Sequence, residues 1–181
     1  MNDTPLSAPQ LSRRGLLKIG LLGSAFLATA GVTASLSGCS ASVPANGLVT
    51  LRSSDLPFLR AAIQVIIEGA ISTAQMAAAV ESSIQKIDYS LTRFSPEMQK
   101  LTVQLFDVLA LGLTRGPLTG VWGSWENASA EDVRNFLSRW QNSSTGLLKM
   151  GHGAILQLVM LAWYGQPESW AHCGYPGPPT V

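Results

Sequence analysis

The stretch SSDLPFLRAAIQVII, residues 53–67, decides the fold class because its apolar side chains recur at the spacing of one helix face. The shared face consists of Leu56, Leu59, Ile63, Ile66, Ile67 and Ala70. Ser54 is a suitable N-cap, Asp55 follows just inside the helix, and Pro57 is tolerated in a first turn. The stretch therefore predicts an amphipathic helix that opens a folded domain.

Two further helices are predicted downstream of this one. The second has an apolar stripe of Val80, Ile84, Ile87, Leu91 and Phe94. Ser95, Pro96 and Glu97 then form a typical helix start. The third stripe, which we expect to face the core, consists of Met98, Leu101, Leu105, Val108, Leu109 and Gly112.

The segment RGPLTGVWGSW, residues 115–125, interrupts the helical pattern with Gly and Pro. Ser129 starts a fourth helix, with the Asp132 carboxylate three residues after the cap. Its apolar face consists of Val133, Phe136, Leu137 and Trp140. Residues 147–163 give a fifth helix, and no alternating strand pattern occurs. We predict an all-α domain, a small irregular bundle of about five helices.

The C-terminal segment YGQPESWAHCGYPGPPTV, residues 164–181, combines Pro and Gly with large aromatic side chains. Its Pro and Gly content predicts an extended tail without regular structure. Because disordered segments seldom keep so many aromatic residues, we expect this tail to lie against a surface. That surface is either the domain's own core or a partner protein. The candidate partner contacts are Trp163, Tyr164, Trp170, Cys173, Tyr175 and Pro176.

The N-terminus carries a targeting pattern. Residues 12–18 are similar to the twin-arginine export consensus, with Leu where Phe is usual. The matching residues are Ser12, Arg13, Arg14, Leu16, Leu17 and Lys18. The uncharged run 19–36 is long enough to span a bilayer as a permanent anchor, but its moderate hydrophobicity favours the apolar region of a cleaved signal.

The sequence LSGCS, residues 36–40, resembles a bacterial lipobox, in which Cys39 becomes the acylated N-terminus. A plain cleaved signal is the alternative. The chain then divides into a signal peptide (1–38), a small and polar lipid-anchored tether (39–53) and a helical domain (54–181). We expect an exported protein on the periplasmic side, and Ser40 after Cys39 favours the outer membrane where one exists.

Composition and motifs favour a non-enzyme. The 12 Lys and Arg nearly balance the 11 Asp and Glu, and no basic block indicates nucleic acid. No cofactor loop or nucleophile motif occurs, so we predict no catalytic residue, bound cofactor or metal in this chain. A metal-binding module that uses His152, His172 and Cys173 is a weaker hypothesis.

Cys173 is the odd cysteine of the chain if Cys39 is acylated. An odd cysteine in an oxidising compartment indicates an intermolecular disulfide, and we hypothesise that Cys173 bridges to a partner subunit. A small buried residue is the alternative.

Three stretches behind a twin-arginine leader resemble the gluconate 2-dehydrogenase subunit 3 family. They are residues 53–67, VRNFLSRW at 133–140 and WYGQPESWAHCGYPGPP at 163–179, of which GYPGPP is the most specific. Members of this family accompany the large flavin subunit of membrane-bound dehydrogenases of the glucose-methanol-choline class. Here Glu68 and Gly69 stand where the family usually has Pro after the first helix.

The resemblance implies a non-catalytic small subunit. It would escort a folded flavin-dependent dehydrogenase through twin-arginine export, stabilise it and tether it at the membrane, with FAD held by the partner. Whether a cytochrome subunit joins the complex is left open. The alternative is a free-standing periplasmic lipoprotein that acts as a helical binding or structural module.

Overall fold

The computed structural model describes residues 43–177, with the side chains of Ala171 and His172 left out. Within this range the chain forms seven α-helices, one short 3-10 helix and no strand, which confirms the predicted all-α bundle. The elements are α2 (Leu56–Ile66), α3 (Thr73–Leu91), α4 (Pro96–Ala110), α5 (Gly112–Thr119), η1 (Trp125–Asn127), α6 (Ala130–Gln141), α7 (Gly146–Tyr164) and α8 (Pro167–Cys173).

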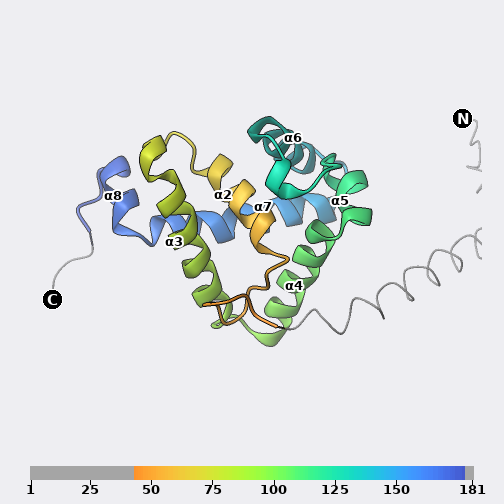
Figure 1. Cartoon of the computed structure of the whole chain (residues 1–181), viewed down its shortest axis with the longest axis horizontal. Helices are drawn as coiled ribbons and strands as arrows, with labels where there is room; N and C mark the ends of the chain where they lie inside the picture. The colour runs from red at the N-terminus through yellow and green to blue at the C-terminus, as the bar shows by residue number, and fades with distance from the viewer. Residues whose placement is uncertain (1–42, 178–181) are drawn as a thin grey trace, which may run out of the picture. The chain divides into compact units, whose positions relative to one another are not determined.

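Helices α2 and α7 organise the packing (Figure 1). Helix α2 contacts α3, η1, α6 and α7, and α7 contacts α2, α3, α6 and α8. Phe58 of α2 lies at the centre of an aromatic cluster, with its ring centroid 5.2 Å from Trp125 and 6.1 Å from Phe106. Phe136 extends this cluster to Trp140 at 5.0 Å. The rings meet edge to face or tilted, as aromatic quadrupoles prefer.

The predictions for α3, α6 and α7 are confirmed. The core faces of α3 and α6 bury Val80, Ile84, Ile87, Leu91, Val133, Phe136 and Trp140, as their spacing predicts. Ser129 and Asp132 form a reciprocal capping box at the start of α6. The fifth predicted helix is α7, which begins one residue earlier and ends one residue later than expected.

At the start of α2, the N-cap prediction is wrong by one residue. The N-cap is Asp55, and Ser54 lies outside the helix. The Asp55 carboxylate makes no capping hydrogen bond to the helix backbone, because it accepts hydrogen bonds from the Arg52 guanidinium instead. Pro57 lies in the first turn as predicted.

On α4, the predicted core face is confirmed only in part. Leu109 is buried and Leu105 packs against the core as predicted, but Met98 and Leu101 are 51% and 61% exposed. Thr102 and Phe106 are buried in their place. The helix carries two apolar stripes, and the one with the large Phe106 ring packs against Phe58. Burying an aromatic ring removes more apolar surface from water than burying Met98 or Leu101 would.

Two segments predicted to be irregular are helical. Residues 115–119 belong to α5 despite Pro117, and the helix ends at Gly120, which adopts the left-handed conformation with φ 87°. The Thr119 hydroxyl donates to the Arg115 carbonyl at 2.7 Å and reinforces this last turn. Residues 167–173 form α8, where Pro167 is compatible with a first turn. The tail is therefore extended only beyond Gly174 in the described range.

Candidate functional site

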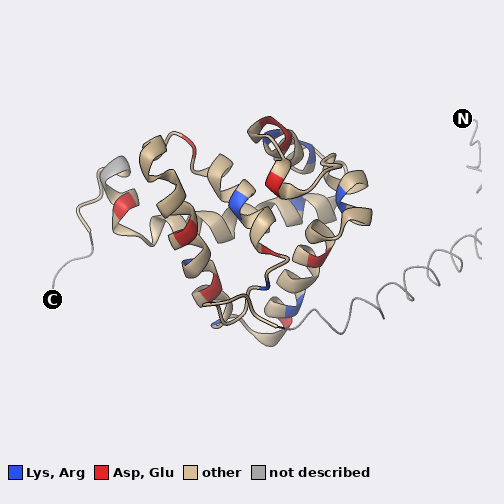
Figure 2. Cartoon of the chain, in the orientation of Figure 1, with Lys and Arg blue, Asp and Glu red and all other residues tan. Residues whose placement is uncertain are grey.

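Charged groups of the described chain are spaced along the helices (Figure 2). Among the described side chains, no three His, Cys, Asp or Glu residues gather as metal ligands would. His152 is partly buried in α7, and this burial lowers the pKa of its imidazole below the ordinary value of 6.5. Its ring is therefore neutral near pH 7, where it packs as a half-buried side chain.

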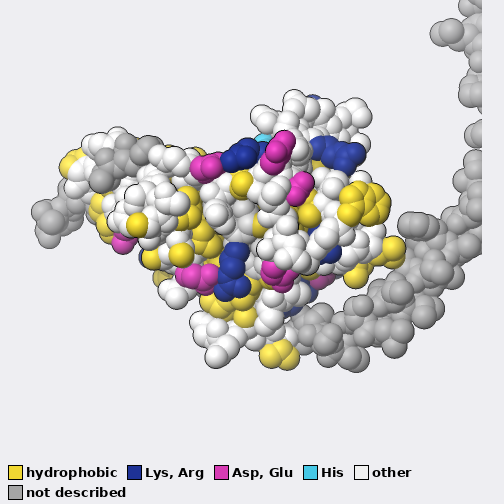
Figure 3. Space-filling view, turned by 45° about the horizontal axis from the view of Figure 1, so that its top comes forward, with side chains coloured by type: hydrophobic (Ala, Val, Ile, Leu, Met, Phe, Trp, Pro, Cys, Tyr) yellow, Lys and Arg dark blue, Asp and Glu magenta, His cyan; other side chains and the backbone are white. Residues whose placement is uncertain are grey.

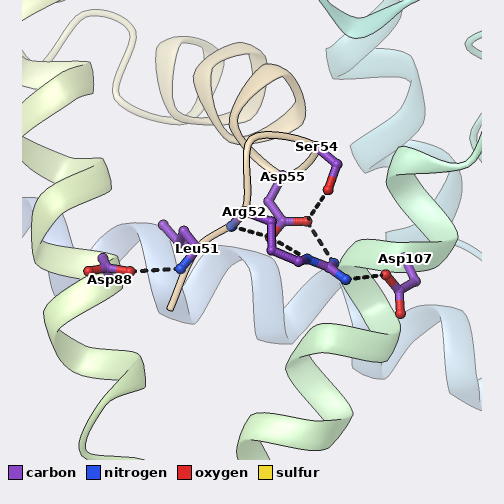
Figure 4. A network of polar contacts seen from close by, with 6 residues as sticks. All are labelled: Leu51, Arg52, Ser54, Asp55, Asp88 and Asp107. Atoms are coloured by element: carbon purple, nitrogen blue, oxygen red, sulfur yellow. Dashed lines mark hydrogen bonds and ion pairs between the residues drawn. The ribbon is translucent and has the colours of Figure 1, made fainter. Parts of the chain in front are cut away.

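The densest polar network fixes the N-terminal segment 44–52 to the bundle (Figure 4). The Asp88 carboxylate of α3 accepts hydrogen bonds from the backbone N–H groups of Val49, Thr50 and Leu51, each at 2.8 Å. Asp88 is buried, so these three donors replace the water that its charge loses.

Arg52 makes the second half of this network. Its guanidinium donates to Asp55 at 2.8 and 3.0 Å and to Asp107 of α4 at 2.7 Å. The hydrogen bond to Asp55 is the main reason that the pKa of Arg52 is raised above its ordinary value. The guanidinium therefore stays charged, and it joins the start of α2 to α4.

These contacts correct the predicted tether. Residues from Pro44 onward belong to the folded unit, in which Ala45, Leu51 and Arg52 are buried and Pro44 forms an antiparallel bridge with Arg52. The composition predicted a tether up to residue 53. In the structure, Asp88 accepts hydrogen bonds from the backbone N–H groups of this segment, and Arg52 forms ion pairs that join the segment to the helices. Residues 39–42 lie outside the described part.

A small cavity beside the network is lined by Leu51, Asp55, Gln99 and Phe106, among others. It is large enough for about one water molecule. Each charged side chain of the network is already paired within it, so the arrangement serves to hold the segment.

The outward face of α7 is mostly apolar, with Gln157 as the polar residue in its middle. We call it the α7 stripe, which consists of Leu147, Met150, Ala154, Gln157, Leu161 and Tyr164. Leu147 and Met150 are 70% and 67% exposed, and the helix has one charged residue, Lys149. Helix α7 is long and apolar enough to cross a membrane. Within the folded domain, 28% of its most apolar 18-residue stretch is buried. One side of the helix thus belongs to the core, and the other is open.

Five of the six predicted partner contacts gather at the C-terminal end of α7, in what we call the C-terminal patch. It consists of Tyr164, Trp170, Cys173, Tyr175 and Pro176. The Trp170 indole N–H donates to the Tyr164 carbonyl at 3.1 Å, and its ring meets Tyr175 edge to face at 5.5 Å. The patch is therefore a defined surface, and Tyr164 joins it to the α7 stripe.

The sixth candidate, Trp163, is a correction. Its side chain is 1% exposed and lies in the core, because it falls on the α7 face opposite the stripe together with Val159. Cys173 is exposed and free, so the alternative of a small buried cysteine is wrong. Export residues 12–18 and Cys39 lie outside the described residues.

Sequence reasoning missed two exposed apolar regions. The first is the α7 stripe, whose three-and-four spacing is visible in the sequence. The second region consists of Leu113 on α5 and Trp122 in the loop after this helix, which are 75% and 78% exposed. Hydrophobic side chains gather at the α5 side of the face in Figure 3. Gly116 admits the Trp122 ring against the helix backbone.

Comparison with known proteins adds no relative. The chain matches no protein-family model, and the searches of curated proteins and of solved structures found no match.

Proposed function

We propose that this protein is a non-catalytic accessory subunit that binds a flavin-dependent dehydrogenase, escorts it through twin-arginine export and holds it at a membrane through acylated Cys39. The observation that carries the proposal is the α7 stripe, which continues into the C-terminal patch. A helix that exposes this much apolar surface typically has a partner. FAD and the chemistry belong to that partner.

The composition of this surface favours a protein as the occupant. Protein interfaces are depleted of charge at their centre and enriched in Tyr, Trp and Met. The α7 stripe with the C-terminal patch has this character, because it offers Met150, Tyr164, Trp170 and Tyr175, and Lys149 is the one charged residue of α7. Helix α7 is almost free of charge colours in Figure 2.

The predicted twin-arginine signal at residues 12–18 gives a reason why such a partner would need this chain. A flavin subunit acquires its cofactor while folding in the cytoplasm and is then exported folded. A subunit that lacks its own signal depends on a partner that has one. Binding to the folded form alone would also stabilise the dehydrogenase by mass action.

A matched pair of variants tests the docking surface. Leu161 on the α7 stripe is 62% exposed and Leu101 on α4 is 61% exposed, so Leu161→Asp and Leu101→Asp place the same charge at equally open sites. The tagged full chain is purified from native membranes in mild detergent. We expect a large flavin-containing subunit with wild type and Leu101→Asp, and its loss with Leu161→Asp. A colourless wild-type protein without that subunit would instead support the free-standing lipoprotein.

A further inference from the structure

We propose that the domain contacts the lipid surface directly through the end of the bundle at which the chain enters it. We call this region the tether end. Its exposed residues include Val49, Tyr89, Arg93, Met98 and Lys100. The inference rests on the proposed function in one respect, which is the acyl anchor at Cys39.

Hydrogen bonds bring these residues to one end. Asp88 binds the backbone of Val49, and the next residue, Tyr89, points outward with the Arg93 guanidinium over its ring. The Gln99 side chain donates to the Leu91 carbonyl at 2.7 Å, which joins the first turn of α4 to the end of α3. In Figure 1 the folded unit begins at this lower end, beside the turn between α3 and α4.

The exposed side chains at the tether end are those that lipid interfaces favour. Val49 is 70% exposed, and Tyr89 and Met98 are also open. Apolar and tyrosine side chains lie at the boundary between headgroups and acyl chains, and Lys and Arg attract anionic headgroups. Arg93 and Lys100 supply two exposed cations against one exposed acid, Glu97, because Asp88 is buried and bonded.

The covalent chain limits how far this end can lie from the membrane. Cys39 precedes Pro44, the first residue of the folded unit, by five residues. Five extended residues span at most about 18 Å, so acyl chains in the bilayer hold the tether end close to the headgroups. Asp88 and Arg52 fix residues 49–52 to the bundle, so the anchor orients the whole domain. The α7 stripe has no comparable cations and suits a protein partner better.

A fluorescent label tests this contact in the full acylated chain. Cys173→Ser removes the free thiol, and a single cysteine is then introduced by Val49→Cys or by Asn135→Cys. Asn135 is an exposed residue of α6, at the upper side of Figure 1. The protein is reconstituted in vesicles of phosphatidylcholine with or without phosphatidylglycerol. Quenching of the label by nitroxide-bearing lipid is measured, and mass spectrometry of the N-terminal peptide checks acylation.

We expect quenching at position 49 to be several-fold greater than at position 135, and greater with phosphatidylglycerol. Arg93→Glu should remove the dependence on the anionic lipid, and the control Lys149→Glu should keep it. Equal quenching at the two positions, with or without acylation, would overturn the inference. The test needs no flavin subunit, so its failure is distinct from failure of the proposed docking.

Discussion

Asp88 accepts a hydrogen bond from the backbone N–H of Leu51 at 2.8 Å, across 37 positions of the sequence. The same oxygen accepts from Thr50, and the second carboxylate oxygen accepts from Val49. A buried carboxylate with three backbone donors is a strong, charge-assisted arrangement. It explains why a segment with a linker-like composition lies fixed against α3.

Asp88→Asn should therefore destabilise the fold. The amide keeps one acceptor oxygen but presents an N–H₂ group to the Val49 N–H, so a partly buried hydrogen bond is lost and two donors face each other. We expect a loss of about 2 kcal/mol in the free energy of unfolding, measured by urea denaturation. Asp107→Asn is the matched control, because Asp107 is 55% exposed, and it should cost less than about 1 kcal/mol. Equal effects would refute this role of Asp88.

Two glycines of α7 should respond oppositely to alanine. A Cβ at Gly151 would lie 2.5 Å from the Trp140 ring, which is buried and donates its N–H to the Leu118 carbonyl. Gly151→Ala should cost about 1–3 kcal/mol through overpacking. A Cβ at Gly153 meets nothing within 4 Å, so Gly153→Ala should stabilise by about 0.5–1 kcal/mol. Thermal unfolding of both variants checks the contrast, and stabilisation by Gly151→Ala would contradict this packing.

His152 should make stability depend on pH. Its folded pKa is lowered by burial, so between the unfolded value of 6.5 and the folded value the unfolded chain binds more protons. The stability present above pH 6.5 should thus fall as the pH drops through this window. His152→Gln should flatten the profile there, as measured by urea denaturation at several pH values.

The same profile contains an internal control at lower pH. Glu81 has a lowered pKa because Arg60 donates to it, and Asp132 has one because Ser129 donates to it. These two carboxylates stabilise the fold at pH values above their ordinary pKa, and this stabilisation is lost as the pH falls through their lowered folded pKa values. His152→Gln should leave that acidic limb unchanged. An unaltered slope near pH 6 in this variant would rule out His152 as the group responsible.

Cys173 is exposed on the C-terminal patch, where a partner would meet it. We therefore expect the purified complex to run as a linked pair on a non-reducing gel and as separate subunits after reduction. Cys173→Ser should abolish the linked band without dissociating the complex in a native gel. Separate subunits under non-reducing conditions would exclude the disulfide.

The helices could be predicted from the sequence wherever one apolar stripe dominates. Helix α6 is the clearest case, because Ser129 and Asp132 mark its start and Val133, Phe136 and Trp140 mark its face. Helix α4 shows the limit. It offers two apolar stripes, and its own sequence does not indicate that the one with Phe106 packs against Phe58.

The candidate site was predictable only in part. Aromatic residues near the C-terminus indicated the patch, but Trp163 and Tyr164 are neighbours in the sequence, and Trp163 is buried whereas Tyr164 is exposed. Segment 44–52 is held in place by hydrogen bonds from its backbone N–H groups to Asp88, which is distant in the sequence. No local sequence pattern indicates these hydrogen bonds.

Export of the partner tests the central claim most directly. Arg13→Lys with Arg14→Lys is introduced in the native host, and protein-bound flavin and dye-reducing dehydrogenase activity are measured in periplasm-facing membranes and in the cytoplasm. The proposed function predicts that both disappear from the membranes and that the flavin subunit accumulates, folded, in the cytoplasm. A flavin subunit that reaches the membranes unaffected, while this chain remains in the cytoplasm, would contradict the escort role.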